Sequence, residues 1–100
     1  MEEGSYRQSR LCRLLGNPLA FAVVQLLAEN KELSVGAIAR ALGRSVQRVS
    51  TVLGVLRVAE VVRYQMDGRR NQYRLKHPSE VKSVLTALSR FVKAASPVRR

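Results

Sequence analysis

The chain has 100 residues, 46% of them hydrophobic, which is enough for one modest core. Its 18 Lys and Arg residues against 7 Asp and Glu give a formal net charge of +11, which favours a polyanionic partner, nucleic acid ahead of an anionic membrane surface. The one cysteine, Cys12, excludes an intrachain disulfide, and no apolar run approaches the ~18 residues of a membrane span. Because the N-terminus also lacks an apolar leader segment, we expect a cytoplasmic protein.

Two amphipathic helices are predicted in the first third of the chain. The first spans about residues 5–15, with Ser5 as its N-cap and Gly16 after its end. The second begins at Asn17-Pro18, because Asn caps a helix and Pro at the first helical position lacks only an N–H that would have no partner. Its apolar residues recur at the spacing of one buried helical face: Leu19, Ala22, Val23, Leu26 and Leu27.

Residues 34–56 have the pattern of two short helices around a tight turn. Ser34 can cap the first of these helices, and Ser45 can cap the second. Gly43 stands between them, where a helix end favours a left-handed residue. The residues expected to be buried are Ala37, Ile38, Ala41 and Leu42 in the first helix and Val49, Val52, Leu53 and Leu56 in the second. Such a pair forms a helix-turn-helix, whose second helix can enter a DNA major groove; an ordinary helical hairpin is the alternative.

A β-hairpin is predicted over residues 61–75, because Asp67-Gly68 separates two runs of strand-forming residues. With Met66 opposite Arg69, the face that packs on the helices would carry Val62, Tyr64, Met66, Asn71 and Tyr73. The other face would be cationic, with Arg63, Gln65, Arg70, Gln72 and Arg74. A basic hairpin after a helix-turn-helix is a wing, which can hold phosphates or reach the minor groove; a solvated hairpin is the alternative.

The chain is expected to end in a helix over about residues 79–95, capped by Ser79 or His77. Its apolar face is broader than a small domain needs at the chain end, which favours pairing with a second copy. We therefore expect a homodimer to which the last helix contributes Val84, Leu85, Leu88, Phe91 and Val92.

These elements predict a mainly α fold with a small β-hairpin, a winged helix-turn-helix that forms a single DNA-binding domain over residues 1–100. Residues 40–76 carry nine of the 18 basic residues and two of the seven acidic ones, so double-stranded DNA is the expected partner. The candidate major-groove contacts are Ser45, Gln47, Arg48, Ser50 and Thr51, because Gln and Arg can read base edges and hydroxyls bind bases or phosphates. The candidate DNA-backbone contacts are Arg40, Arg44, Arg57 and Arg63, and the wing contacts are Arg69, Arg70 and Gln72.

The chain resembles the ArsR/SmtB-type winged-helix repressors over nearly its whole length, most clearly in residues 15–27, 32–50 and 61–78. The resemblance implies a homodimer joined through the first and last helices, which adds Leu11 and Leu14 to the expected interface. It also implies two recognition helices on a palindromic operator, and repression that an inducer relieves. The family's metal-sensing Cys-Val-Cys element is Ser34-Val35-Gly36 here, and the last helix has no His, so we expect no metal and no cofactor. Glu60 stands where the family usually has Gly, so we expect it in a backbone conformation that Gly favours.

Some residues leave alternatives open. Cys12 is either a redox-active thiol that could bridge the dimer or an ordinary small apolar residue. No combination of Ser, His and Asp or of Cys and His suits catalysis, so an enzyme is not expected. The apolar residues Gly54, Val55 and Val58 lie where a DNA-binding face is usually polar, which favours the alternative of an architectural, non-specific nucleic-acid-binding or protein-interaction winged helix.

Overall fold

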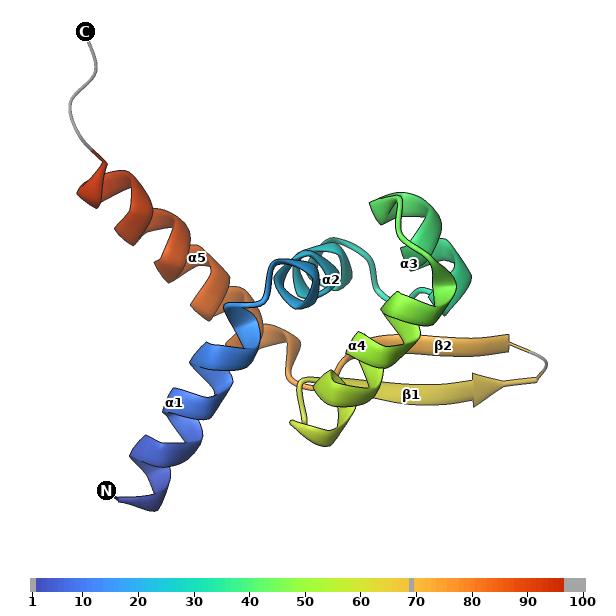
Figure 1. The fold of residues 1–100 in the computed structure, drawn as a ribbon, viewed down its shortest axis with the longest axis horizontal. Coiled ribbons are helices and arrows are strands. Elements are labelled where there is room, and N and C mark those ends of the chain that lie inside the picture. The colour runs from blue at the N-terminus through green and yellow to red at the C-terminus, as the bar shows by residue number, and fades with distance from the viewer. Residues whose placement is uncertain (1, 69, 97–100) are drawn as a thin grey trace, which may run out of the picture.

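The computed structural model describes residues 2–68 and 70–96 as five helices and one two-stranded sheet (Figure 1). The elements are α1 (Glu3–Leu15), α2 (Pro18–Glu29), α3 (Val35–Leu42), α4 (Val46–Val58), β1 (Val62–Asp67), β2 (Arg70–Leu75) and α5 (Pro78–Ala95). The predicted fold class and the predicted order of elements are confirmed. Within the described residues no single helix is both long and apolar enough to cross a membrane; α1 and α2 meet that requirement only as a pair bent by 93°.

The core lies where α2, α3, α4 and the base of the hairpin meet. Its buried residues are Ala20, Val23, Val24 and Leu27 on α2, Ile38 and Ala39 on α3, Val49, Leu53 and Leu56 on α4, and Val61, Val62 and Leu75 at the hairpin. No described residue of α1 or α5 is fully buried, and both helices extend away from the core on the side opposite the hairpin tip (Figure 1).

The predicted core of α3 is wrong at two positions, and one of them is Ala37, which is half-buried outside the core cluster, whereas Val35 packs against that cluster. Ala41 is exposed, and Ala39 is buried in its place. The residues that face the core are Val35, Ile38, Ala39 and Leu42, which recur at i, i+3, i+4 and i+7 and so form one helical stripe. Ala41 lies beside that stripe, so its methyl group faces solvent.

Three helices begin at the caps that the sequence predicts. The side chain of Asn17 accepts a hydrogen bond from the Ala20 N–H at 3.0 Å, Ser34 from Ala37 at 3.1 Å, and Ser45 from Arg48 at 3.2 Å. The turn between α3 and α4 also follows the prediction, because Gly43 has φ +63°. These bonds satisfy backbone groups that a helix end leaves without intrahelical partners.

The predicted starts of the outer helices are wrong by one or two residues. The first helix begins at Glu3, with Glu2 in the cap position, so Ser5 lies inside it. Glu3 in the first turn is favoured by the positive end of the helix dipole. The last helix begins at Pro78, whose fixed φ suits the first helical position. His77, one of the two predicted caps, occupies the cap position, but its side chain makes no capping hydrogen bond.

The hairpin has the predicted faces but not the predicted register. Met66 pairs with Asn71 rather than with Arg69, and Asp67 pairs with Arg70 as the last residue of β1. A shift of two residues keeps every side chain on its face, because side chains alternate with period two. The helix-facing side is nevertheless covered only near its base: Met66 is 62% exposed and Asn71 is exposed, since the strands extend beyond the core.

A third strand-like segment, which the sequence pattern does not indicate, joins the hairpin to the helices. Leu33 pairs with Tyr73 in an isolated antiparallel bridge, and the two N–H···O distances are 3.0 and 2.8 Å. Leu33 lies just before α3, so this bridge attaches β2 to the start of the helix-turn-helix. The orientation of the hairpin relative to α3 is therefore fixed by backbone hydrogen bonds as well as by side-chain packing.

The expected strained residue lies between α4 and β1. Glu60 has φ +68°, and the Val61 N–H donates to the Leu56 carbonyl at 2.9 Å in the manner of a left-handed helix end. The Glu60 carboxylate accepts a hydrogen bond from Lys76 and pairs with its charge, which lowers the pKa of Glu60 from its ordinary value. Both side chains of this ion pair are exposed, so it contributes little to stability.

We predict that Glu60→Gly raises the Tm by a few degrees, because the left-handed region is strained for every residue with a Cβ. The matched variant Glu60→Gln keeps the strain and removes only the carboxylate charge. Because the folded pKa of Glu60 is lowered, its ion pair stabilises the protein above the ordinary Glu pKa of about 4.3 and loses that effect as the pH falls through the lower folded value. Thermal melts should show that Glu60→Gln is slightly less stable than wild type at pH 7 and equally stable in acid. A Tm of Glu60→Gly below that of wild type would contradict the strain argument.

Candidate nucleic-acid interface

The α4 helix presents a polar face to solvent over its first two turns. The three residues Gly43–Ser45 connect it to α3, and its opposite face is buried through Val49, Leu53 and Leu56. The predicted major-groove residues are all exposed: Ser45, Gln47, Arg48, Ser50 and Thr51. The core therefore sets which side of α4 is available to a ligand.

Two of these five side chains are already engaged. The Ser45 hydroxyl oxygen accepts the capping bond from Arg48, and the Thr51 hydroxyl donates to the Gln47 carbonyl at 3.0 Å. Within residues 2–68 and 70–96, the side chains of Gln47, Arg48 and Ser50 make no hydrogen bond to the protein. Among the described residues, all the donors and acceptors of these three side chains are therefore free for a partner, whereas the Ser45 hydroxyl can still donate and the Thr51 hydroxyl can still accept.

The four arginines predicted to contact a DNA backbone are all exposed, but one has a partner within the chain. Arg40 lies on α3, Arg44 in the turn, and Arg63 on β1. The guanidinium of Arg57 lies over the Tyr64 ring, 5.3 Å from its centroid. Tyr64 in turn contacts Tyr73, with 5.2 Å between ring centroids. Arg57 therefore connects α4 to the hairpin, a role that sequence spacing alone does not indicate.

The outward face of the hairpin is polar and cationic, as predicted. Arg63 and Arg74 lie directly opposite each other, and the Arg74 guanidinium donates to the Gln65 side-chain oxygen at 3.0 Å. Of the predicted wing contacts, Gln72 is half-buried on β2. The backbone of Arg70 begins β2, and Arg69 lies outside the described residues.

The second half of α4 differs in chemistry from the first. Val55 is 49% exposed and Val58 is 85% exposed. Gly54, just before Val55, is also exposed, and a Cβ added there would meet no atom within 4 Å beyond its neighbours and its own helix backbone. The glycine is therefore not required by packing within the chain.

The predicted dimer residues divide into two groups. Leu14 and Leu85 are half-buried and pack against the core of their own chain. The others are exposed on α1 and α5, namely Leu11, Val84, Leu88, Phe91 and Val92. Cys12 is a free, exposed thiol on α1, so the alternative of an ordinary buried cysteine does not hold for the single chain.

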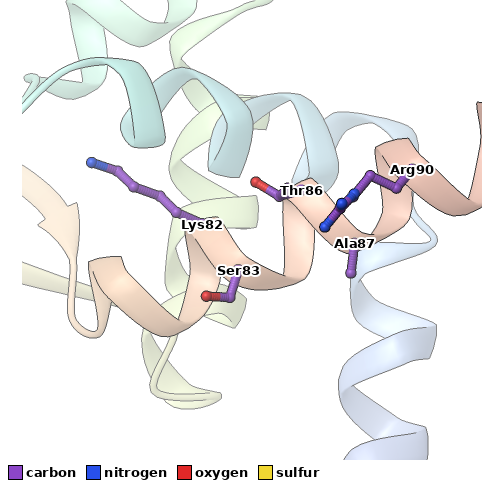
Figure 2. Close-up of a pocket in the computed structure, with 5 residues that line it drawn as sticks. All are labelled: Lys82, Ser83, Thr86, Ala87 and Arg90. Atoms are coloured by element: carbon purple, nitrogen blue, oxygen red, sulfur yellow. The ribbon is translucent and has the colours of Figure 1, made fainter.

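A shallow surface hollow of about 370 Å³ lies along α5, lined by Lys82, Ser83, Thr86, Ala87 and Arg90 (Figure 2). Two of these residues are cations, which do not ligate metals. Across the described part of the chain, no three His, Cys, Asp or Glu side chains gather closely enough to hold a metal ion.

Solved structures with the same architecture are regulators. HlyU from Vibrio cholerae N16961 is 28% identical, with a TM-score of 0.79, over 91% of this chain and 97% of HlyU. The transcriptional repressor BigR from Xylella fastidiosa is 28% identical, with a TM-score of 0.69, over 83% of this chain and 87% of BigR. Mb0332 from Mycobacterium bovis is a homodimeric winged helix-turn-helix DNA-binding domain and a possible ArsR-family regulator. It is similar in fold, at 23% identity and a TM-score of 0.81 over 94% of this chain and 85% of that chain.

The fold, the exposed second helix of the helix-turn-helix and these structures define the class: a winged helix-turn-helix of the type found in ArsR-family regulators. The predicted resemblance to that class is thereby confirmed. The chain belongs to the family described as HVO_A0114, whose model matches residues 17–81. No curated protein matches the sequence.

We predict that Gly54→Ala stabilises the protein by about 0.5–1 kcal/mol, because Gly is unfavourable inside a helix and the added methyl group has room. The matched control is Gly43→Ala, where the added Cβ also meets nothing within 4 Å but φ is +63°. That variant should lose roughly 1–2 kcal/mol from left-handed strain alone. Urea unfolding measures both free energies of unfolding, and a destabilising Gly54→Ala would show that glycine serves packing there.

Proposed function

We propose that this protein is a sequence-specific DNA-binding transcription regulator that acts as a homodimer. The observation that carries the proposal is the first half of α4, where Gln47, Arg48 and Ser50 are exposed and have no hydrogen-bond partner among the described residues, on a helix whose other face is buried. A helix held in this way can enter the major groove, where Gln pairs with adenine and Arg with guanine.

The charges support a polyanionic partner. Arg63 lies opposite Arg74 on the outward face of the hairpin, and like charges directly opposite each other destabilise a strand pair. Phosphates placed against that face would remove the repulsion. Arg40 on α3 and Arg44 in the turn are two further exposed cations, on the helix-turn-helix. In this proposal they contact the DNA backbone, whereas Arg57 positions the hairpin through Tyr64.

The apolar surfaces of α1 and α5 support the dimer. Phe91 is 71% exposed and lies on α5, the longest of the described helices. Pairing through α1 and α5 would cover this surface and place two copies of α4 on successive major grooves, roughly 34–36 Å apart. A palindromic operator follows from the symmetry. Repression is the proposed mode of action, because BigR is a transcriptional repressor.

We predict different effects for the two kinds of arginine. Arg48→Ala should lose about 1–3 kcal/mol of discrimination between the DNA upstream of its own gene and a scrambled duplex, because the base contact is lost. Arg63→Ala should weaken binding to both duplexes alike and reduce the slope of log K against log salt by about 0.9 per protomer. Fluorescence anisotropy over a salt series measures both quantities.

The same titration tests the proposed function itself. Binding to the upstream DNA that is about a thousandfold tighter than binding to the scrambled duplex would support a sequence-specific regulator. Equal affinity of the wild-type protein for both duplexes would instead favour an architectural protein. Equal losses from both variants on every sequence would contradict the separate roles assigned to Arg48 and Arg63.

The dimer is tested by adding one negative charge to α5. Phe91→Glu should convert the dimer to a monomer in sedimentation velocity, because a carboxylate at an apolar interface loses its hydration. Ser83→Glu adds the same charge on the polar side of α5, where the residue lines the surface hollow (Figure 2), and should stay dimeric. A wild-type monomer at micromolar concentration, or dissociation by both variants, would contradict the interface.

A further inference from the structure

The outward side of α4 changes from polar to apolar halfway along the helix. Gln47, Thr51 and Val55 follow one another at intervals of four residues, so they lie in a row on one face. Gly54 and Val58 lie beside the same row, three and seven residues after Thr51. The polar groups proposed to read bases are thus continuous with an exposed apolar surface.

We propose that this apolar half of α4 reads the 5-methyl groups of thymine in the major groove, with Val55 as the contacting residue. The inference rests on the proposed DNA-binding function and names the chemistry of the bases that the site selects. Thymine is the base whose major-groove edge carries a methyl group, and apolar side chains recognise it there. The half-site would therefore carry thymines beside the bases that Gln47 and Arg48 contact.

The size of the surface favours a base over a protein partner. A stable protein interface buries roughly 800 Å² on each partner, from about 20–30 residues. The apolar part of α4 offers Val55, Val58 and the bare backbone of Gly54. Arg48 and Arg57 on the same helix and Arg63 on β1 are exposed cations, which suit a polyanion around a small apolar contact. The patch matches a few methyl groups set among phosphates.

Gly54 gives a second, independent reason to infer that a base lies against this half of α4. A helix interior is weakened by glycine, and no neighbour within the chain requires the missing Cβ. Glycine has a purpose at this position if another molecule approaches the helix backbone closely. A thymine edge deep in the groove is such a molecule, and its methyl group would contact Val55, the residue after Gly54.

The experiment separates the methyl group from every other feature of the base. Binding sites are first selected from a random duplex library prepared with dTTP, and each selected duplex is then made again with deoxyuridine in place of thymidine. Uracil lacks only the 5-methyl group. We expect wild-type affinity to fall by about three- to fivefold for each methyl group contacted, the amount that burial of one methyl contributes.

The variants assign that loss to Val55. Val55→Ala should bind the thymine and uracil duplexes nearly equally. Val46→Ala is the matched control, because Val46 is a similarly exposed valine, 52% against 49%, on the opposite side of the same helix. Val46→Ala should keep the wild-type ratio of affinity for the thymine duplex to affinity for the uracil duplex. Arg48→Ala should keep this ratio as well, while it lowers both affinities.

Each outcome decides a different question. A wild-type ratio near one on selected sites would overturn the methyl readout and leave the proposed function standing. A ratio that persists in Val55→Ala would overturn the assignment to Val55. Failure to select any site would overturn the proposed function, and this inference with it.

Discussion

The α4 helix is attached to the core by Val49, Leu53 and Leu56, whose side chains are fully buried. Each such side chain contributes roughly 1.5–3 kcal/mol, which far exceeds the penalty of about 0.5–1 kcal/mol for a glycine inside the helix. The buried face can therefore hold α4 in place, which leaves the outward face free to carry the residues that we propose contact DNA. The exposed glutamine and arginine, and the glycine itself, depend on this anchoring.

The hairpin is fixed to the same core by contacts of two kinds. The backbone bridge between Leu33 and Tyr73 joins β2 to the start of α3, and Arg57 over Tyr64 joins the end of α4 to β1. Both contacts meet at the aromatic pair of Tyr64 and Tyr73. The helix-turn-helix and the hairpin are thus held in one relative orientation, so that a duplex could meet α4 and the cationic face together.

The outer helices, α1 and α5, are not held by buried side chains as α4 is. Both α1 and α5 are amphipathic but bury no residue fully within residues 2–68 and 70–96, although Leu14 and Leu85 rest against the core. A chain of 100 residues has a limited interior, and in our proposal another copy covers the apolar surface left on these two helices. The side of the molecule that we propose for DNA and the side that we propose for dimerisation lie at opposite ends of the core (Figure 1).

The sequence by itself determined the order of elements, the caps at Asn17, Ser34 and Ser45, and the left-handed positions at Gly43 and Glu60. These features depend on neighbours along the chain, through hydrogen bonds and allowed backbone angles. Only the tertiary structure decided the pairing of Met66 with Asn71, the burial of Ala39 in place of Ala41, and the partners of Arg57 and Leu33. Those features depend on segments distant in sequence, and apolar periodicity allows a strand to shift by two residues, or a short helix to rotate, without changing its pattern.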